Sequence, residues 1–153
     1  MRQLSIIPCG KKKIWDKQRD HGPAKASQTY IGTFHRLCRN YALQFTDQWV
    51  VLSAKHGFLL PADIVDENYD VTFKQKHNST EIITIDRLQQ QVREKQLDRY
   101  DELIILAGKK YKKVIADSFN CDMPKKFPLE TFSGMGYMQQ ALKQAVADNR
   151  PLH

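Results

Sequence analysis

The sequence predicts an α/β protein with three layers, in which a mostly parallel central sheet has helices on both faces. Three short apolar runs, Leu4–Pro8, Trp49–Ala54 and Glu102–Ala107, lack the polar alternation of a strand with one face in water. Segments with helical periodicity separate these runs, and such alternation is typical of parallel sheets covered on both sides. Since parallel strands are joined by right-handed crossovers, we expect the ends of all three strands at one edge of the sheet.

Four segments have the apolar spacing of helices. In the first, from Phe34 to Phe45, apolar residues recur at i, i+3, i+4 and i+7, and Thr33 is expected to cap its start. A second helix is expected over Thr80–Leu97. A third, Tyr111–Phe119, follows the last apolar run directly, and the fourth covers Met135–Val146.

Three stretches lack any such period. Gly10–Thr29 reads as a loop of about twenty residues, and loops of that length in compact domains are usually functional or disordered. Leu59–Thr72 is rich in proline and aspartate, with a short extended piece expected at Tyr69–Phe73. Two prolines make Cys121–Ser133 irregular or partly extended.

The composition indicates one globular domain over residues 1–153, with 41% hydrophobic and 27% charged residues. The three cysteines, Cys9, Cys38 and Cys121, cannot all pair and are too few for a disulfide scaffold, which favours a reducing compartment. No apolar run approaches the roughly 20 residues that span a bilayer, so we expect no membrane partner. The first residues do not fit a signal peptide, and the expected location is cytoplasmic.

The charge balance favours anionic partners. Lysine and arginine number 24 against 17 aspartates and glutamates, a formal net charge of +7. A basic surface attracts nucleic acids, nucleotides or phosphorylated metabolites. The alternative is an even spread of solvated lysines, and only the placement of the charges separates the two.

A glycine and at least one lysine follow each of the three apolar runs. Ligands of open α/β sheets bind beyond the carboxyl ends of the strands. There, glycine lets the backbone approach a ligand and lysine supplies a positive charge. The residues expected to form a phosphate-sized cationic pocket are Gly10, Lys11, Lys13, Ser53, Lys55, Gly108, Lys109 and Tyr111.

Other features add to this edge. Gly134 and Gly136 open the last helix, where free backbone N–H groups would receive an anion, although a tight turn explains the glycines equally well. The aromatic candidates to stack a base or sugar ring are Trp15, Tyr30, Tyr69 and Tyr111, and the alternative for each is a packing role. Neither a Walker loop nor a dinucleotide-binding glycine pattern is present.

Cys9 is a candidate nucleophile because nearby lysines would stabilise its thiolate. His21 or His56 would supply the histidine that such a cysteine needs. The alternative is that Cys9 is a small apolar residue at the end of a core strand. No cysteine or histidine spacing fits a zinc site, and we expect neither a metal nor a cofactor.

An acidic cluster in the loop after the second apolar run is the candidate source of a general base. It consists of Asp63, Asp66, Glu67 and Asp70. Beside a bound phosphate, such carboxylates would also suit Mg²⁺. The alternative is a solvated loop surface.

Several motifs resemble an uncharacterised family of small bacterial and phage-borne proteins: Pro8-Cys9-Gly10-Lys11, Ser53-Ala54-Lys55-His56-Gly57 and Gly108-Lys109-Lys110-Tyr111. A more distant similarity is to the catalytic domain of archaeosine synthases, whose fold is like that of uracil-DNA glycosylases. Pro8, Cys9, Lys13 and His21 match its motif, whereas Ile14 and Gln18 depart from it. The resemblance implies a glycosylase-like fold whose edge pocket receives a nucleobase or nucleotide.

We therefore expect a protein that binds a nucleotide or nucleic-acid phosphate at the strand-end edge and acts on a base or its glycosidic bond. Lys13, Lys55 and Lys109 would hold the phosphate. One alternative is a non-catalytic basic module that binds nucleic acid through its surface. Another is a cysteine-dependent transferase, which requires an exposed and reactive Cys9.

Overall fold

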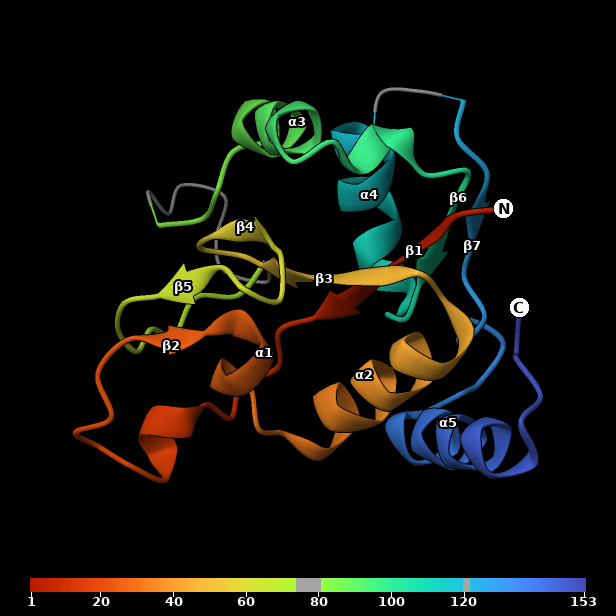
Figure 1. Ribbon diagram of the computed structural model, residues 1–153, viewed down its shortest axis with the longest axis horizontal. Helices are drawn as coiled ribbons and strands as arrows, with labels where there is room; N and C mark the ends of the chain where they lie inside the picture. The colour runs from red at the N-terminus through yellow and green to blue at the C-terminus, as the bar shows by residue number, and fades with distance from the viewer. Residues whose placement is uncertain (74–80, 120–121) are drawn as a thin grey trace.

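The computed structural model describes residues 1–73, 81–119 and 122–153. Its centre is a five-stranded sheet in the order β4-β3-β1-β6-β7 (Figure 1). The strand bounds are β1 (Gln3–Pro8), β3 (Gln48–Ser53), β4 (Gly57–Leu59), β6 (Glu102–Ile105) and β7 (Lys125–Lys126). β1 pairs in parallel with β3 on one side and β6 on the other, β7 extends the parallel sheet beyond β6, and β4 is antiparallel to β3. The predicted α/β class with a mostly parallel sheet is confirmed.

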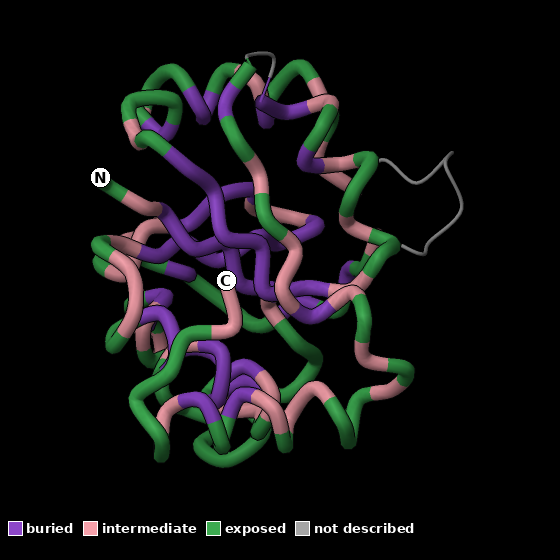
Figure 2. Tube along the Cα trace, turned by 90° about the vertical axis from the view of Figure 1, so that its right-hand side faces the viewer, coloured by how far each residue is buried: buried purple, intermediate pink, exposed green. Residues whose placement is uncertain are grey.

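Helices cover both faces of this sheet. α2 (Thr33–Phe45) and α5 (Met135–Asp148) lie below it in Figure 1, and α3 (Ile85–Glu94) and α4 (Lys112–Ser118) lie above it. The central strands are buried on both faces and run through the middle of the molecule in Figure 2. This explains why their sequences show no polar alternation. Successive residues of β1 point to opposite faces of the sheet and pack in two different apolar clusters. Ile6 packs with residues of α3 and α4, and Ile7 packs with residues of α2 and α5.

The predicted loop over residues 10–29 holds short elements that its sequence did not reveal. They are η1 (Ile14–Asp16), β2 (Ala24–Lys25) and α1 (Ala26–Thr29). β2 pairs in antiparallel fashion with β5 (Ile64–Val65). The extended piece expected at residues 69–73 is not a strand. Two residues a strand are too few to produce a recognisable period.

Two helix starts also differ from the predictions. The cap of α2 is Gly32, without a side-chain hydrogen bond, and Thr33 is its first residue. The helix expected from Thr80 begins at Ile85 because Thr84 caps it, accepting a hydrogen bond from the Arg87 backbone N–H. It is followed by η2 (Leu97–Arg99), and η3 (Lys109–Tyr111) precedes α4. Thr80 and Cys121 lie outside the described residues.

The turn that follows β3 is held by a buried side chain of α3. Gln91 accepts a hydrogen bond from the Phe58 backbone N–H and donates one to the carbonyl oxygen of His56, both at 2.8 Å. Gly57, at φ +75°, lies so close that a Cβ there would come within 2.0 Å of the Gln91 Oε1. Gln91 and Gly57 together fix the direction in which the chain leaves β3.

Among the described residues, no helix has the length and apolar character needed to cross a membrane.

Candidate functional site

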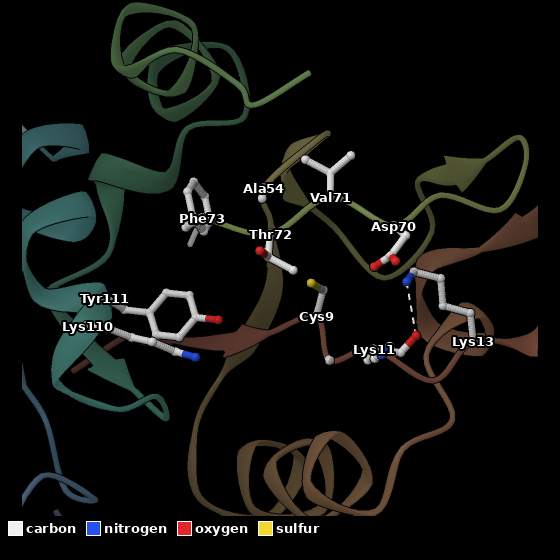
Figure 3. Close-up of a pocket in the computed structure, with 11 residues that line it drawn as sticks. Cys9, Lys11, Lys13, Ala54, Asp70, Val71, Thr72, Phe73, Lys110 and Tyr111 are labelled. Carbon is white, nitrogen blue, oxygen red and sulfur yellow. Dashed lines mark hydrogen bonds between the residues drawn. The ribbon is translucent and has the colours of Figure 1, made fainter. Parts of the chain in front are cut away.

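The ends of the three central parallel strands converge, as the sequence predicted. We call the cavity between them the Cys9 recess; its volume is about 220 Å³. In Figure 3 the end of β1 forms its floor, Ala54 lies behind, residues 70–73 cross above, and Lys110 and Tyr111 close one side. The lining residues are Cys9, Gly10, Lys11, Lys13, Ala54, Asp70, Val71, Thr72, Phe73, Lys110 and Tyr111.

Lys13 is the most buried cation of this recess, with 4% of its surface exposed. Its Nζ donates to the carbonyl oxygen of Lys11 at 3.1 Å and lies 4.5 Å from the centre of the Tyr69 ring. The ion pairs among the described residues do not include Lys13. Asp70 lies on the same side of the recess in Figure 3, and it too is absent from the ion pairs among the described residues. An ammonium group that is buried without a carboxylate partner is costly unless something else supplies the counter-charge.

A chain of hydroxyl groups stands behind Lys13. The Tyr69 hydroxyl hydrogen-bonds to the Tyr30 hydroxyl and, at 2.8 Å, to the Ser53 hydroxyl. Burial raises the pKa of both tyrosines, so both phenols are protonated at neutral pH. The Ser53 oxygen also accepts from the backbone N–H groups of Lys55 and His56, at 3.2 and 3.1 Å. The chain is neutral and therefore does not provide the anion that Lys13 lacks.

Cys9 lines the recess with a half-buried side chain. In Figure 3 its sulfur faces the space between Thr72 and Tyr111. Burial raises the pKa of the Cys9 thiol, and the positive charge of Lys13 only partly opposes that rise. Burial, with a smaller contribution from Cys9, also raises the pKa of Tyr111 to about 12. The thiol is thus protonated at neutral pH, which does not favour the expected nucleophile.

A second cavity opens on the other side of the β1 end, and we call it the helix-end recess. Its volume is about 380 Å³, and it shares four lining residues with the Cys9 recess: Gly10, Lys11, Lys110 and Tyr111. The first residues of α2 and α5 form its far wall. The remaining lining residues are Pro8, Gly32, Thr33, Phe34, His35, Gly108, Met135, Met138 and Gln139.

His35 ties the start of α2 to the end of β1. Its Nδ1 lies 3.1 Å from the carbonyl oxygen of Pro8, and the residue is 2% exposed. Burial lowers the pKa of His35 to about 4, so the ring is neutral at pH 7. Since a carbonyl only accepts, Nδ1 carries the proton and donates, which leaves Nε2 as a buried acceptor without a partner among the described residues.

The acidic cluster of the sequence is divided by the structure. Asp70 lines the Cys9 recess, whereas Asp66 and Glu67 line a separate shallow depression beside Trp15. Asp63 accepts from the Leu60 backbone N–H and pairs with Lys95 at 2.8 Å, so it holds the loop in place and does not reach the recess. Asp70 is thus the one carboxylate of the four that the described part of the chain brings to this site.

Several other expected binding residues support the recess from outside it. Trp15 is buried, and its Nε1 donates to the carbonyl oxygen of Gly22 at 3.0 Å. The Lys55 Nζ is 5.8 Å from the Tyr69 ring centre. The His56 ring meets the same ring edge-on at 4.9 Å. Burial lowers the pKa of His56, Lys55 lowers it further, and its Nε2 has no partner among the described residues.

The remaining predicted residues are spread around the edge. Gly108 lines the helix-end recess. Lys109 and Gly134 line another depression, next to Glu130. Gly136 lies in the first turn of α5, outside both recesses. Of the four predicted lysines, Lys11 and Lys13 reach a recess and Lys55 and Lys109 do not. Among the described residues, Lys110 also reaches both recesses.

Sequence reasoning missed residues of two kinds. Thr72 and Phe73 come from a segment without a period, and nothing in the sequence showed that they line the recess. Phe34 and Met138 were assigned to the apolar stripes of their helices, yet both also line the helix-end recess. A residue in the first turn of a helix often lies at the sheet edge, and this was the available signal.

Within residues 1–73, 81–119 and 122–153, no three His, Cys, Asp or Glu side chains gather as a metal site.

The fold and the edge define a class: an α/β protein with a parallel sheet and a lysine-bearing recess at the carboxyl ends of its strands. The family of unknown function DUF6884 matches residues 4–144, and the chain belongs to that family. It is 49% identical over 152 residues to the uncharacterized protein YfjM of Bacillus subtilis (strain 168), covering 99% of this chain and 100% of that protein. No solved structure matches the chain.

Proposed function

We propose that the Cys9 recess binds the phosphate group of a nucleotide, with Lys13 as the principal cation. The observation that carries this proposal is the buried ammonium of Lys13, which uses one of its three N–H donors on the Lys11 carbonyl and has no ion-pair partner among the described residues. A phosphate would supply both the missing charge and the missing acceptors. Charge-assisted hydrogen bonds of this kind are about twice as strong as neutral ones.

Aromatic side chains support a ring as the other part of the ligand. Phe73 and Tyr111 line the recess, with ring centres 6.1 Å apart and planes at 88°. Two rings set edge to face offer an apolar corner to a base or sugar. The resemblance of Pro8, Cys9, Lys13 and His21 to the archaeosine synthase motif adds support for a nucleobase, because Cys9 and Lys13 lie in this recess.

Binding is tested with uridine 5′-monophosphate and the other three common ribonucleoside monophosphates, with uridine and with inorganic phosphate, by thermal shift and calorimetry. The monophosphate is expected to bind more tightly than uridine. Lys13→Met should weaken its binding by about 10- to 100-fold, the value of a hydrogen-bonded charge pair. Lys12→Met is the matched control, since Lys12 is exposed and lines neither recess.

Two outcomes would contradict this proposal. One is that neither phosphate nor any of the four common ribonucleoside monophosphates shifts the melting temperature. The other is that Lys13→Met binds them as the native chain does. Oligonucleotide binding that survives Lys13→Met and weakens steeply with salt would instead support the non-catalytic basic module.

A second candidate function, hydrolysis of the N-glycosidic bond, is favoured by Asp70 in the same recess. Its carboxylate would take a proton from water as the water oxygen bonds to C1′. The C1′–N bond would break with its electron pair on the base, which takes up a proton from solvent. Chromatography for free uracil tests this activity. Asp70→Asn should abolish it and Asp66→Asn should not, whereas no release by the native chain would exclude it for uridine monophosphate.

A further inference from the structure

We propose that the two recesses form one site for a ligand made of two nucleosides joined through a phosphate link. This inference rests on the proposed function and extends it, because it names the ligand as a dinucleotide unit rather than a mononucleotide. The link would lie over the four residues that both recesses share, and one nucleoside would occupy each side.

The shared rim suits an anionic link. Lys11 and Lys110 are both exposed and both line the two cavities, so their charges can reach a group that crosses from one to the other. Gly10 lies between the cavities with φ +74°, a conformation that L side chains rarely adopt. The crossing point therefore has a bare backbone flanked by two cations, which favours the close approach of a phosphate.

The helix-end recess suits the second ring. Phe34, Met135 and Met138 give it an apolar wall, and Met135 is 52% exposed although it is a large apolar side chain. Methionine packs adaptably against flat rings because its side chain is unbranched and polarizable. With about 380 Å³ against 220 Å³, this cavity has more room than the one beside Lys13.

The starts of two long helices add donors to the same cavity. α2 and α5 each have a glycine at the cap without a side-chain hydrogen bond, and neither has an acidic residue in its first turn. Residues of both first turns line the recess. Unpaired backbone N–H groups at a helix start favour negative charge, which supports a ligand with phosphate oxygens on this side.

The test compares three probes by calorimetry: uridine 5′-monophosphate, 5′-phosphorylated uridylyl-uridine, and two uridines joined through a pyrophosphate. At least one two-nucleoside probe is expected to bind about tenfold more tightly than the monophosphate. A gain with the phosphodiester identifies a nucleic-acid strand as the source of the ligand. A gain with the pyrophosphate identifies a free dinucleotide.

Thr33→Glu tests the location, because it adds a negative charge at the start of α2, where an acid does not harm the helix. It should remove the gain and change monophosphate binding by less than about threefold. Asn40→Glu adds the same charge on the exposed surface of α2 and should leave the gain intact. Met138→Trp, which fills the cavity, is the second variant and should also remove the gain.

The outcomes separate this inference from the proposed function. If the monophosphate binds and neither longer probe binds more tightly, the two-part site is wrong and the phosphate site stands. If the gain survives both Thr33→Glu and Met138→Trp, the second nucleoside does not lie in the helix-end recess and the inference is overturned. If no probe binds at all, both proposals fail together.

Discussion

Lys13 and Lys95 are two largely buried lysines that differ in whether the chain pairs their charge with a carboxylate. The Lys95 side chain is 22% exposed, forms an ion pair with Asp63 at 2.8 Å, and donates to the carbonyl oxygen of Phe58. Lys13 is 4% exposed and donates to the Lys11 carbonyl, and the part of the chain that the structure describes gives it no carboxylate partner. The charge of Lys95 is paired within the chain, whereas the charge of Lys13 is the one that we propose a phosphate neutralises.

This difference separates a lysine that stabilises the fold from one that we propose binds a ligand. The Lys95–Asp63 pair joins α3 to the loop after β4 and so holds the segment that continues to Asp70. Lys13 lies in the cavity to which that segment leads. A buried charge left without a counter-ion lowers stability, so its presence at a strand-end edge is more informative than the net charge of +7.

The largest expected effect on stability comes from His35. Like Lys13 it is a buried basic side chain, but burial keeps its ring neutral at pH 7. Its pKa of about 4 in the folded chain lies below the ordinary 6.5, so the unfolded chain binds more protons between these values. The contribution of His35 to the free energy of unfolding is therefore fully present above about pH 6.5 and is lost as the pH falls toward 4. The integrated loss is about 3 kcal/mol.

Urea unfolding between pH 4 and 7 measures the His35 contribution. His35→Asn, which keeps a donor near Pro8, should flatten the dependence, although it packs less well. His21→Asn, at an exposed histidine, should not. An unchanged slope in His35→Asn would mean that His35 is not the titrating group.

The next effect concerns the paired lysine. Lys95→Met leaves Asp63 without its cation, and we expect a loss of about 1 kcal/mol in the free energy of unfolding. Nucleotide binding at constant temperature should change by less than about twofold. A double-mutant cycle with Asp63→Ala should show a coupling of about 0.5 kcal/mol or more. Additive losses would show that the pair contributes nothing.

Lys13→Met should have the opposite effect on stability. Replacing a buried, unpaired charge by an apolar side chain of similar length should leave the free energy of unfolding unchanged or raise it by about 1 kcal/mol. Urea denaturation of Lys13→Met beside Lys95→Met measures the contrast. A loss in Lys13→Met as large as that in Lys95→Met would break the comparison, because Lys13 would then be structural.

The smallest effect distinguishes two adjacent lysines. Lys110 lines both recesses, whereas Lys109 lines a separate depression near Glu130. Lys110→Met should weaken binding of uridine monophosphate by about threefold, the usual value of an exposed charge, and Lys109→Met should have no measurable effect. Calorimetry at two salt concentrations measures the affinity of both variants. Equal losses of affinity in the two variants would indicate that a basic surface attracts the ligand without a defined site.

The fold was largely predictable, and the candidate site was predictable in part. Apolar runs at Leu4, Trp49 and Leu103 identify central strands because such strands are buried on both faces. The strand ends then place Cys9 and Lys13 at one edge. The same reasoning could not separate Lys110 from Lys109, since a single residue of 3-10 helix decides which side chain faces the cavity.

By itself, the sequence determined the α/β class, the parallel core and the edge at which the central strands end, because burial and periodicity are local patterns. Only the tertiary structure decided which charges remain unpaired there. Asp63 and Asp70 are alike in the sequence, yet one neutralises Lys95 and the other lines a recess beside a lysine that it does not neutralise. The energy of a charge depends on its distance from groups far along the chain, and no local pattern records that distance.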